Sequence, residues 1–254
     1  MTGTYLDQLS WPEAETALSA DPVILIPLGA RLKEHGYHLP LNNDWLLARY
    51  FCRRVMEQAN VLVTPTVQFS FFPAFVDYPG SVNINRDTAG QLLNDLISSL
   101  ARHGGKRFYV LNTGISTNWV LEPLRLKLAE QQVSMTYLDL LEALPEIEQQ
   151  VAEQSCGSHA DEIETSMMLY IQPEVVRVER AVDASTPYQA GPFRRDPTQT
   201  GLYSPSGAWG DPTLATWEKG EFVVEKLVGA ILDEINDFSS EDWQPQTANK
   251  RYLE

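Results

Sequence analysis

The sequence predicts an α/β protein built on a mainly parallel sheet that helices cover on both faces. The first observation is a set of short, continuous apolar runs, such as PVILIPLG at 22–29. Such runs are typical of strands that are buried on both faces. The second observation is that segments with helical periodicity alternate with these runs, which is the pattern of βαβ units.

The order of the elements follows from these runs and from the helix start signals. The predicted strands are 22–29, 60–67, 106–114 and 134–141. The first predicted helix begins near Asn43 or Asp44, either of which can cap it. The next predicted helix, 88–103, is capped by Asp87. The remaining predicted helices are 118–131, an acidic helix through 154, 160–171 and 216–238. Between the second strand and the next helix, 68–86 reads as a long loop with a short strand at SVNIN (81–85).

We expect one domain that spans 1–254. Residues 172–216 are rich in proline and glycine, which predicts a long excursion over the surface or over a neighbouring subunit. The tail after about 239 is expected to be frayed. No internal repeat interrupts this organisation.

Composition narrows the class of function. The formal charge of −15 and the pI near 4.6 argue against nucleic acid or an anionic membrane as a partner, because phosphates would be repelled. Cys52 and Cys156 fit no metal or redox spacing. The start of the chain does not resemble a signal peptide, and no apolar run approaches eighteen residues. We therefore expect a cytoplasmic protein that acts on a small molecule.

Two clusters of histidines and carboxylates suggest a divalent metal site. The first, KEHGYHLPLNND at 33–44, offers Glu34, His35, His38 and Asp44, and the second, SHADEIETS at 158–166, centres on His159. Imidazole and carboxylate are ligands that zinc and manganese accept. The first cluster follows the first strand, where parallel sheets place their ligands. The alternative is structural, with the histidines only hydrogen-bonded inside loops.

The second cluster is predicted to lie at the start of a helix. On that helix Asp161 and Glu164 share a face, and Glu162 points elsewhere, towards solvent. A carboxylate from 161–164 can therefore join the histidines.

These segments resemble the signature of the creatininase family of amidohydrolases. The likeness begins at IPLGARLKEHGYHLPLNND and continues through DYPGS, LARHGGKRFYVLN and HADEIETSMML to WGDPTLATWEKGE. The order and spacing hold over about 22–225, nearly the whole chain. Five matches in order are far more specific than any one of them.

The resemblance implies a three-layer αβα sandwich, an assembly into homo-oligomers, usually hexamers, and hydrolysis of a cyclic amide, formamide or related C–N bond by a metal-bound hydroxide. It implies that His35 and Asp44 are metal ligands, that His159 carries the proton to the leaving nitrogen, and that Glu164 lies beside it. The implied cofactors are one or two ions of zinc, manganese or iron.

The chain departs from the family pattern at two places. The family's glutamate ligand is replaced by Lys33, although a longer loop could bring Glu34 into its place. The family's Asn-Gly-His turn reads NTGISTN at 112–118 and lacks an imidazole or carboxylate. These departures favour one ion, held by Glu34, His35, Asp44 and Glu164.

The departures also suggest new roles for the residues that replace the family's ligands. Lys33 could serve as an oxyanion partner or as an anchor for a substrate carboxylate, and a solvent-facing lysine is the alternative. Thr113, Gly114 and Ser116 are placed to bind a polar group of the substrate at the start of a helix.

Two other functions are alternatives for this sequence. A divergent member that has lost hydrolysis would use the same pocket to bind a metabolite or would serve as an oligomeric scaffold. A nucleotide-binding dehydrogenase fits the sheet pattern, but GARLKEHG after the first strand lacks the glycine fingerprint. The sequence therefore favours a metal-dependent amidohydrolase.

Overall fold

The centre of the molecule is a five-stranded sheet with the strand order β1-β3-β2-β4-β5. The computed structural model describes residues 2–240 and 243–253. The strands are β1 (Thr4–Tyr5), β2 (Val23–Leu28), β3 (Val61–Val63), β4 (Arg107–Asn112) and β5 (Ser134–Tyr137). All neighbouring strands run parallel, and the four predicted strands are present, each shorter than its apolar run.

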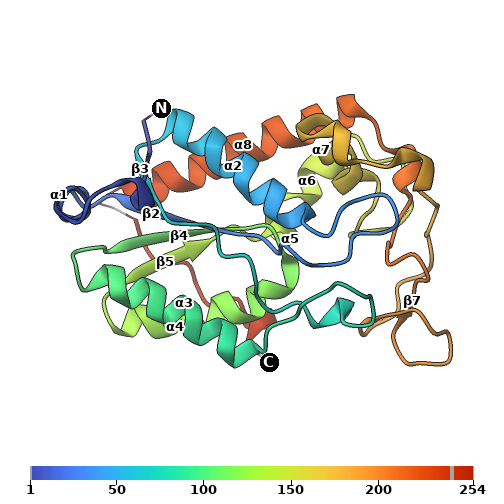
Figure 1. Ribbon diagram of the computed structural model, residues 1–254, viewed down its shortest axis with the longest axis horizontal. Coiled ribbons are helices and arrows are strands. Elements are labelled where there is room, and N and C mark those ends of the chain that lie inside the picture. Colours follow the sequence, from blue (N-terminus) through green and yellow to red (C-terminus); the bar gives the residue numbers. More distant parts are fainter. Residues whose placement is uncertain (1, 241–242, 254) are drawn as a thin grey trace.

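Helices cover both faces of this sheet. The main helices are α1 (Trp11–Ser19), α2 (Asn43–Gln58), α3 (Arg86–Ala101), α4 (Asn118–Glu130), α7 (Glu162–Ile171) and α8 (Trp217–Ser239). Figure 1 shows α2 and α8 on one side of the sheet and α3 and α4 on the other. The predicted α/β class and its three αβα layers are therefore confirmed.

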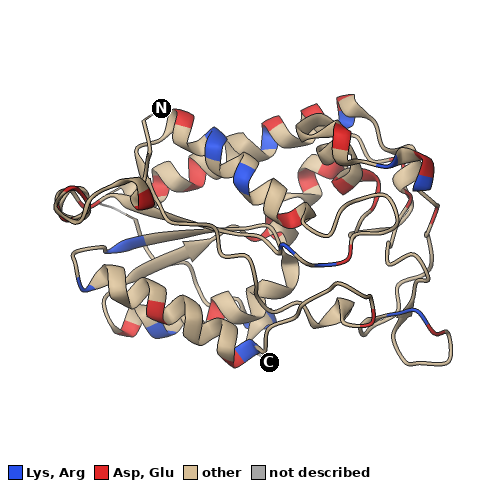
Figure 2. Cartoon of the chain, viewed as in Figure 1, with Lys and Arg blue, Asp and Glu red and all other residues tan. Residues whose placement is uncertain are grey.

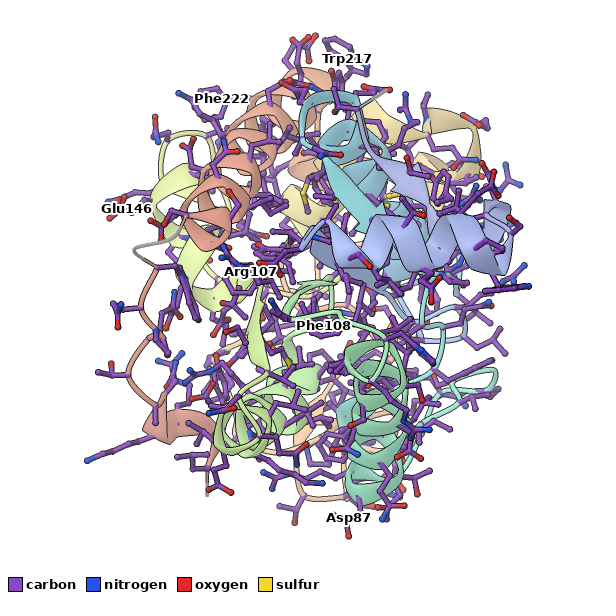
Figure 3. The ribbon with its side chains drawn as sticks, turned by 90° about the vertical axis from the view of Figure 1, so that its left-hand side faces the viewer. Asp87, Arg107, Phe108, Glu146, Trp217 and Phe222 are labelled. Atoms are coloured by element: carbon purple, nitrogen blue, oxygen red, sulfur yellow. The ribbon has the colours of Figure 1, made fainter. Side chains whose placement is uncertain are left out.

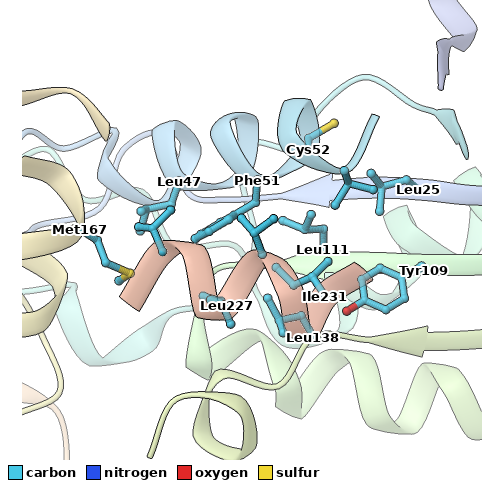
Figure 4. Packing of buried hydrophobic residues seen from close by; sticks show 14 of the residues in the cluster. Leu25, Leu47, Phe51, Cys52, Tyr109, Leu111, Leu138, Met167, Leu227 and Ile231 are labelled. Carbon is cyan, nitrogen blue, oxygen red and sulfur yellow. The ribbon is translucent and has the colours of Figure 1, made fainter. Parts of the chain in front are cut away.

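Alternate residues of each strand fill two separate cores. Leu25 and Tyr109 pack with α2 and α8, and Figure 4 shows their side chains beside Phe51 of α2 and Ile231 of α8. Ile24 and its neighbours on the opposite face pack against α3 and α4. This alternation is what a two-residue period produces when both faces of a strand are buried.

The order of the strands creates a switch point beside β2. The chain runs from β2 through α2 to β3 on one side, and then through α3 to β4 on the other side. The loops that leave β2 and β4 therefore start from the carboxyl ends of adjacent strands and lead to helices on opposite faces of the sheet. This is where open α/β sheets bind ligands.

Short elements make up the rest of the chain. They are the helices α5 (Leu140–Ala143) and α6 (Pro145–Glu148), the strand pair β6 (Phe193–Arg194) and β7 (Leu202–Tyr203), and the 3₁₀ turns Leu6–Gln8, Pro73–Phe75, Ile115–Thr117, Pro173–Val175, Val178–Arg180, Pro212–Leu214 and Lys250–Tyr252. The excursion at 172–216 contains only such elements.

Several local expectations differ from the structure. Residues 81–85 form no strand. The acidic helix predicted through 154 is instead two short helices, the second of which ends at Glu148. They are separate because Pro145 has no backbone N–H to donate, although Leu144 keeps helical dihedral angles. Helix α1 was not anticipated, although Ser10 and Glu13 form a capping box at its start.

The predicted caps also differ. Asn42, not Asn43 or Asp44, precedes α2, and it makes no side-chain cap bond. Asn85 rather than Asp87 caps α3, because its side chain accepts a hydrogen bond from the Asp87 N–H. Asn43 and Asp44 are thereby left inside the first turn of α2.

The tail of the chain packs against α4 instead of fraying. Tyr252 is fully buried, and its hydroxyl donates to Asp139 Oδ2 at 2.6 Å. The Asn118 amide donates to the same hydroxyl at 3.1 Å. Asn118 is the first residue of α4, so the tail is tied to the helix that follows β4.

At the opposite end of the sheet, where the strands begin, Arg107 of β4 contacts the C-terminus of α8. Figure 3 views this edge, with Arg107 near its centre. The Arg107 guanidinium donates to the carbonyl oxygens of Phe238, Ser239 and Ser240 at 3.2, 2.5 and 3.1 Å. Carbonyls at a helix end lack internal partners and carry partial negative charge, so this contact stabilises the C-terminus of α8.

Charged residues concentrate on the helices, and the central strands carry few of them (Figure 2). Among the described residues, no helix combines the length and the apolar character needed to cross a bilayer. One buried exception to the outward placement of charge is Glu162, which was expected in solvent. Its carboxylate pairs with Lys219 of α8 and accepts the N–H groups of Glu153 and Gln154.

Candidate active site

The ends of β2 and β4 meet closely above the sheet. A Cβ atom at Gly29 would lie 2.3 Å from the carbonyl oxygen of Asp44, so only glycine lets the end of β2 pass the first turn of α2. The Thr113 hydroxyl, from the end of β4, donates to that same carbonyl at 2.8 Å. The two loops that were predicted to converge therefore do so.

His35 lies at the centre of the site and is fully buried. Its Nδ1 atom donates to the backbone carbonyl of Lys33 at 2.9 Å, which leaves Nε2 facing two carboxylates. Nε2 is 2.7 Å from Asp44 Oδ1 and 3.4 Å from Glu164 Oε1. A lone pair opposed to two carboxylates requires a cation between them, either a proton or a metal ion.

The shifted pKa values of His35, Asp44 and Glu164 show that positive charge is stabilised at this position. Burial alone would lower the pKa of His35, but Asp44 and Glu164 outweigh it and raise the pKa to about 9. Burial opposes ionisation of Asp44 and Glu164 as well. Even so, Lys33 and His35 hold the pKa of Asp44 below its usual value, and His35 holds that of Glu164 far below it.

His159 approaches from the start of α7 and is held by Glu34. Its Nε2 atom lies 3.1 Å from both the backbone oxygen and Oε2 of Glu34, so Nε2 donates to Glu34. Its other nitrogen, Nδ1, is left free and lies 3.8 Å from Glu164 Oε2. Burial opposes the ionisation of Glu34, but the His159 interaction and the Gly36 N–H lower its pKa.

Glu164 links the two histidines. Its carboxylate accepts the Asn43 amide at 2.8 Å and the Ala160 N–H at 2.7 Å. Within the described part of the chain, His35, His159 and Glu164 form a group that could hold a metal ion, since one ligand atom from each lies within 4.8 Å of the others. Asp161, predicted to share its face, caps α7 through the N–H groups of Ile163 and Glu164.

Lys33 is buried rather than solvent-facing, with 6% of its surface exposed. Its ammonium nitrogen lies 2.7 Å from Asp44 Oδ2 and 5.0 Å from the centre of the Phe75 ring. Among the residues that the structure describes, Oδ2 has no hydrogen-bond partner apart from this ion pair. The two oxygens of Asp44 therefore face different groups, His35 on one side and Lys33 on the other.

A cavity of about 330 Å³ opens beside these groups. Lys33, Asp44, His159 and Glu164 lie in its wall, as do all three predicted substrate-binding residues, Thr113, Gly114 and Ser116. Of the residues first proposed for the site, His38 does not join the group: burial lowers its pKa to about 4, and its Nε2 atom bonds to the Thr165 hydroxyl at 2.8 Å.

The sequence did not reveal the aromatic groups that enclose His159. The centre of the Phe75 ring lies 4.2 Å from the centre of the imidazole, and that of Phe193 lies 5.5 Å from it. Phe75 belongs to the aromatic run SFFPAF, which was a usable signal. Phe193 comes from the excursion at 172–216, and nothing in its local pattern indicated the site.

Known relatives share both sequence and fold with this chain. A family model described as creatininase, creatinine amidohydrolase, matches residues 7–235. The chain belongs to the creatininase family. It is 30% identical to creatinine amidohydrolase of Pseudomonas putida, over 92% of this chain and 96% of that one. It is 26% identical to a mycofactocin precursor peptide peptidase of Mycolicibacterium smegmatis, over 88% and 86% of the two chains.

Solved structures agree with this membership. A manganese form of creatininase superposes with a TM-score of 0.79 at 29% identity, covering 96% of this chain and all of that one. A creatininase variant of the Zn–Zn type gives 0.78 at 28% identity, covering 95% and 98%. The fold and the family resemblance noted in the sequence are confirmed, and the chain is a hydrolase of the creatininase family.

Proposed function

We propose that this chain, acting as one creatininase-like domain, is an amidohydrolase that uses one divalent ion to hydrolyse a C–N bond of a small molecule, such as a cyclic amide or formamide. The observation that carries the proposal is the Nε2 atom of His35, which faces Asp44 and Glu164 inside a buried site. The backbone contact at Nδ1 fixes the tautomer in which Nε2 can bind a metal.

The charges of the site suit one divalent ion. Glu34, Asp44 and Glu164 contribute three carboxylates, and within residues 2–240 and 243–253 Lys33 is the one ammonium in contact with them. With neutral imidazoles this leaves two negative charges in excess. We assign His35, Asp44 and Glu164 as the ligands of zinc, manganese or iron. When bound, such an ion polarises a carbonyl and lowers the pKa of water towards neutrality.

His159 is suited to move the proton. Its Nε2 atom donates to Glu34, so Nδ1 carries the lone pair that can take a proton from water and return it to the leaving nitrogen. Glu34, expected among the ligands, is in contact with His159, so we assign it the role of orienting that ring. Phe75 and Phe193 pack on the imidazole and help to hold the ring in place.

The cavity supports a small-molecule substrate. Its volume of about 330 Å³ is near the lower end of the range of ligand pockets. Thr113, Gly114 and Ser116 would bind a polar group of the substrate. The peptidase names of some relatives extend the candidates to short peptides, whose scissile bond is also an amide. By family resemblance we propose a homo-oligomer, a hexamer, which light scattering after gel filtration will check.

The decisive experiment removes and restores the metal. The protein is stripped with EDTA, reloaded with Zn²⁺, Mn²⁺ or Fe²⁺, and assayed for bound metal and for hydrolysis of cyclic amides, formamides and short peptides. We expect reloading to restore hydrolysis. Protein that binds none of the three ions would contradict the proposal and favour a metabolite-binding or scaffold role.

Variants separate the roles of the residues. His35→Ala and Asp44→Ala should lose metal and activity together. His159→Ala should keep the metal and lose about 100-fold or more in turnover, as expected for a proton-transfer residue. His103→Ala, at an exposed position after α3, is the matched control and should change neither. Glu34→Gln should keep the metal as well, and metal loss there would make Glu34 a ligand.

A further inference from the structure

The two oxygens of the Asp44 carboxylate face different positively charged groups. Oδ1 faces His35 and the proposed metal, and Oδ2 lies 2.7 Å from the Lys33 ammonium. Asp44 is 1% exposed and Lys33 is 6% exposed, so water does not separate or screen them. A carboxylate that uses both oxygens for cations on opposite sides has the arrangement of a bridging ligand, with an ammonium on one side.

Gly114 lies beside Oδ2 of Asp44. Neither Gly114 nor its neighbours, Thr113 and the 3₁₀ turn Ile115–Thr117, carry an imidazole or a carboxylate. A Cβ atom at Gly114 would lie 3.7 Å from Asp44 Oδ2, an ordinary van der Waals distance, and the backbone there does not have a positive φ. A side chain at position 114 would therefore reach Asp44.

A related structure is described as the Zn–Zn type, so a two-ion site occurs on this fold. The geometry of this chain differs from what two ions require. A second divalent ion at Oδ2 would lie against the buried ammonium, with glycine where another ligand would come from. The charge excess around the site is two, and one divalent ion already neutralises it.

We propose that the Lys33 ammonium permanently occupies the place of a second metal ion on Asp44, so that the site accepts one divalent ion only. This inference rests on the proposed function, because it assumes the first ion. Lys33 lines the cavity, so its fixed positive charge also faces the substrate and stabilises negative charge that develops on the carbonyl oxygen. Unlike an ion, this charge stays in place when a chelator is added.

The test counts metal ions in five proteins: the wild type, Lys33→Arg, Lys33→Glu, Gly114→His, and the double variant Lys33→Glu/Gly114→His. Each is equilibrated with excess Zn²⁺ or Mn²⁺ and desalted, and the bound metal is measured by mass spectrometry. Electron paramagnetic resonance of the manganese samples reports coupling between two adjacent ions. Circular dichroism and thermal unfolding check that each variant is folded.

We expect one ion per chain in the wild type and in Gly114→His, because Lys33 is present in both. We expect two ions, with a coupled manganese spectrum, in the double variant. Lys33→Arg, which keeps the charge, should remain at one ion.

Two ions in the wild type, or one ion in a folded double variant, would overturn the role of Lys33. Two ions in the wild type would also overturn the ion count of the proposed function, but neither result contradicts metal-dependent hydrolysis itself. A wild type that binds no metal would instead overturn the proposed function itself. If the double variant fails to fold, the wild type and Gly114→His still decide, since a second ion in either one contradicts the inference.

Discussion

The buried pair of Lys33 and Asp44 should dominate the stability of the metal-free protein. Asp44→Asn removes the carboxylate charge and leaves the ammonium, which is 6% exposed, without its partner. Removal of one member of a buried ion pair costs about 3–5 kcal/mol, because the remaining charge stays desolvated. For a chain of this size, each kcal/mol lowers Tm by about 2–4 °C. We expect Tm to fall by about 6–20 °C.

The measurement is thermal and urea unfolding in EDTA of the wild type, Asp44→Asn, Lys33→Met and the double variant. A thermodynamic cycle over these four proteins isolates the energy of the pair. The double variant should be markedly more stable than the sum of the single losses predicts. The control is Glu57→Gln, which breaks the exposed pair of Arg53 and Glu57 and should cost about 0.5 kcal/mol or less. Additive losses, or a loss in Asp44→Asn as small as in the control, would refute the reasoning.

Two other predictions concern groups outside the metal site. Tyr252→Phe removes the hydroxyl that donates a hydrogen bond to Asp139, so urea unfolding should show that the free energy of unfolding falls by about 1–3 kcal/mol. An unchanged urea midpoint would mean that the tail does not stabilise the fold. Burial and the neighbouring Asp161 raise the pKa of Glu148 from 4.5 to about 7. The folded state therefore keeps this carboxyl protonated at pH values where the unfolded chain ionises it. The free energy of unfolding consequently falls as the pH rises from 4.5 to about 7. Glu148→Gln should therefore raise Tm at pH 8 relative to the wild type and change it little at pH 4, and an equal effect at both would contradict the assignment.

Much of the fold could be predicted because the strands are continuous apolar runs. Parallel strands also gather their carboxyl ends, so the meeting of Asp44 with Thr113 followed from the order of the elements. The family signature placed His159 beside them. These predictions depend on the spacing of apolar residues and on the order of the elements, both of which can be read from a single sequence.

The individual contacts could not be predicted, because they depend on residues far apart in the chain. Glu34 faces His159 partly because Gly207, in the excursion, leaves room for its carboxylate. Glu162 is buried because Lys219 of α8 reaches it. Phe193 packs on His159 although 34 positions separate them. Local patterns contain no record of such pairings.

The two ends of the chain are not equivalent for anyone who prepares this protein. Tyr252 bonds to Asn118, Asn118 accepts from the Asn112 amide, and that same amide donates to the carbonyl of Gly114 in the cavity wall. Thr2, in contrast, bonds to the carbonyls of Met56 and Ala59 at the end of α2, near the edge where the strands begin (Figure 1). An affinity tag near Thr2 would therefore lie away from the cavity, whereas one near Tyr252 would lie next to a chain of hydrogen bonds that leads to the cavity wall.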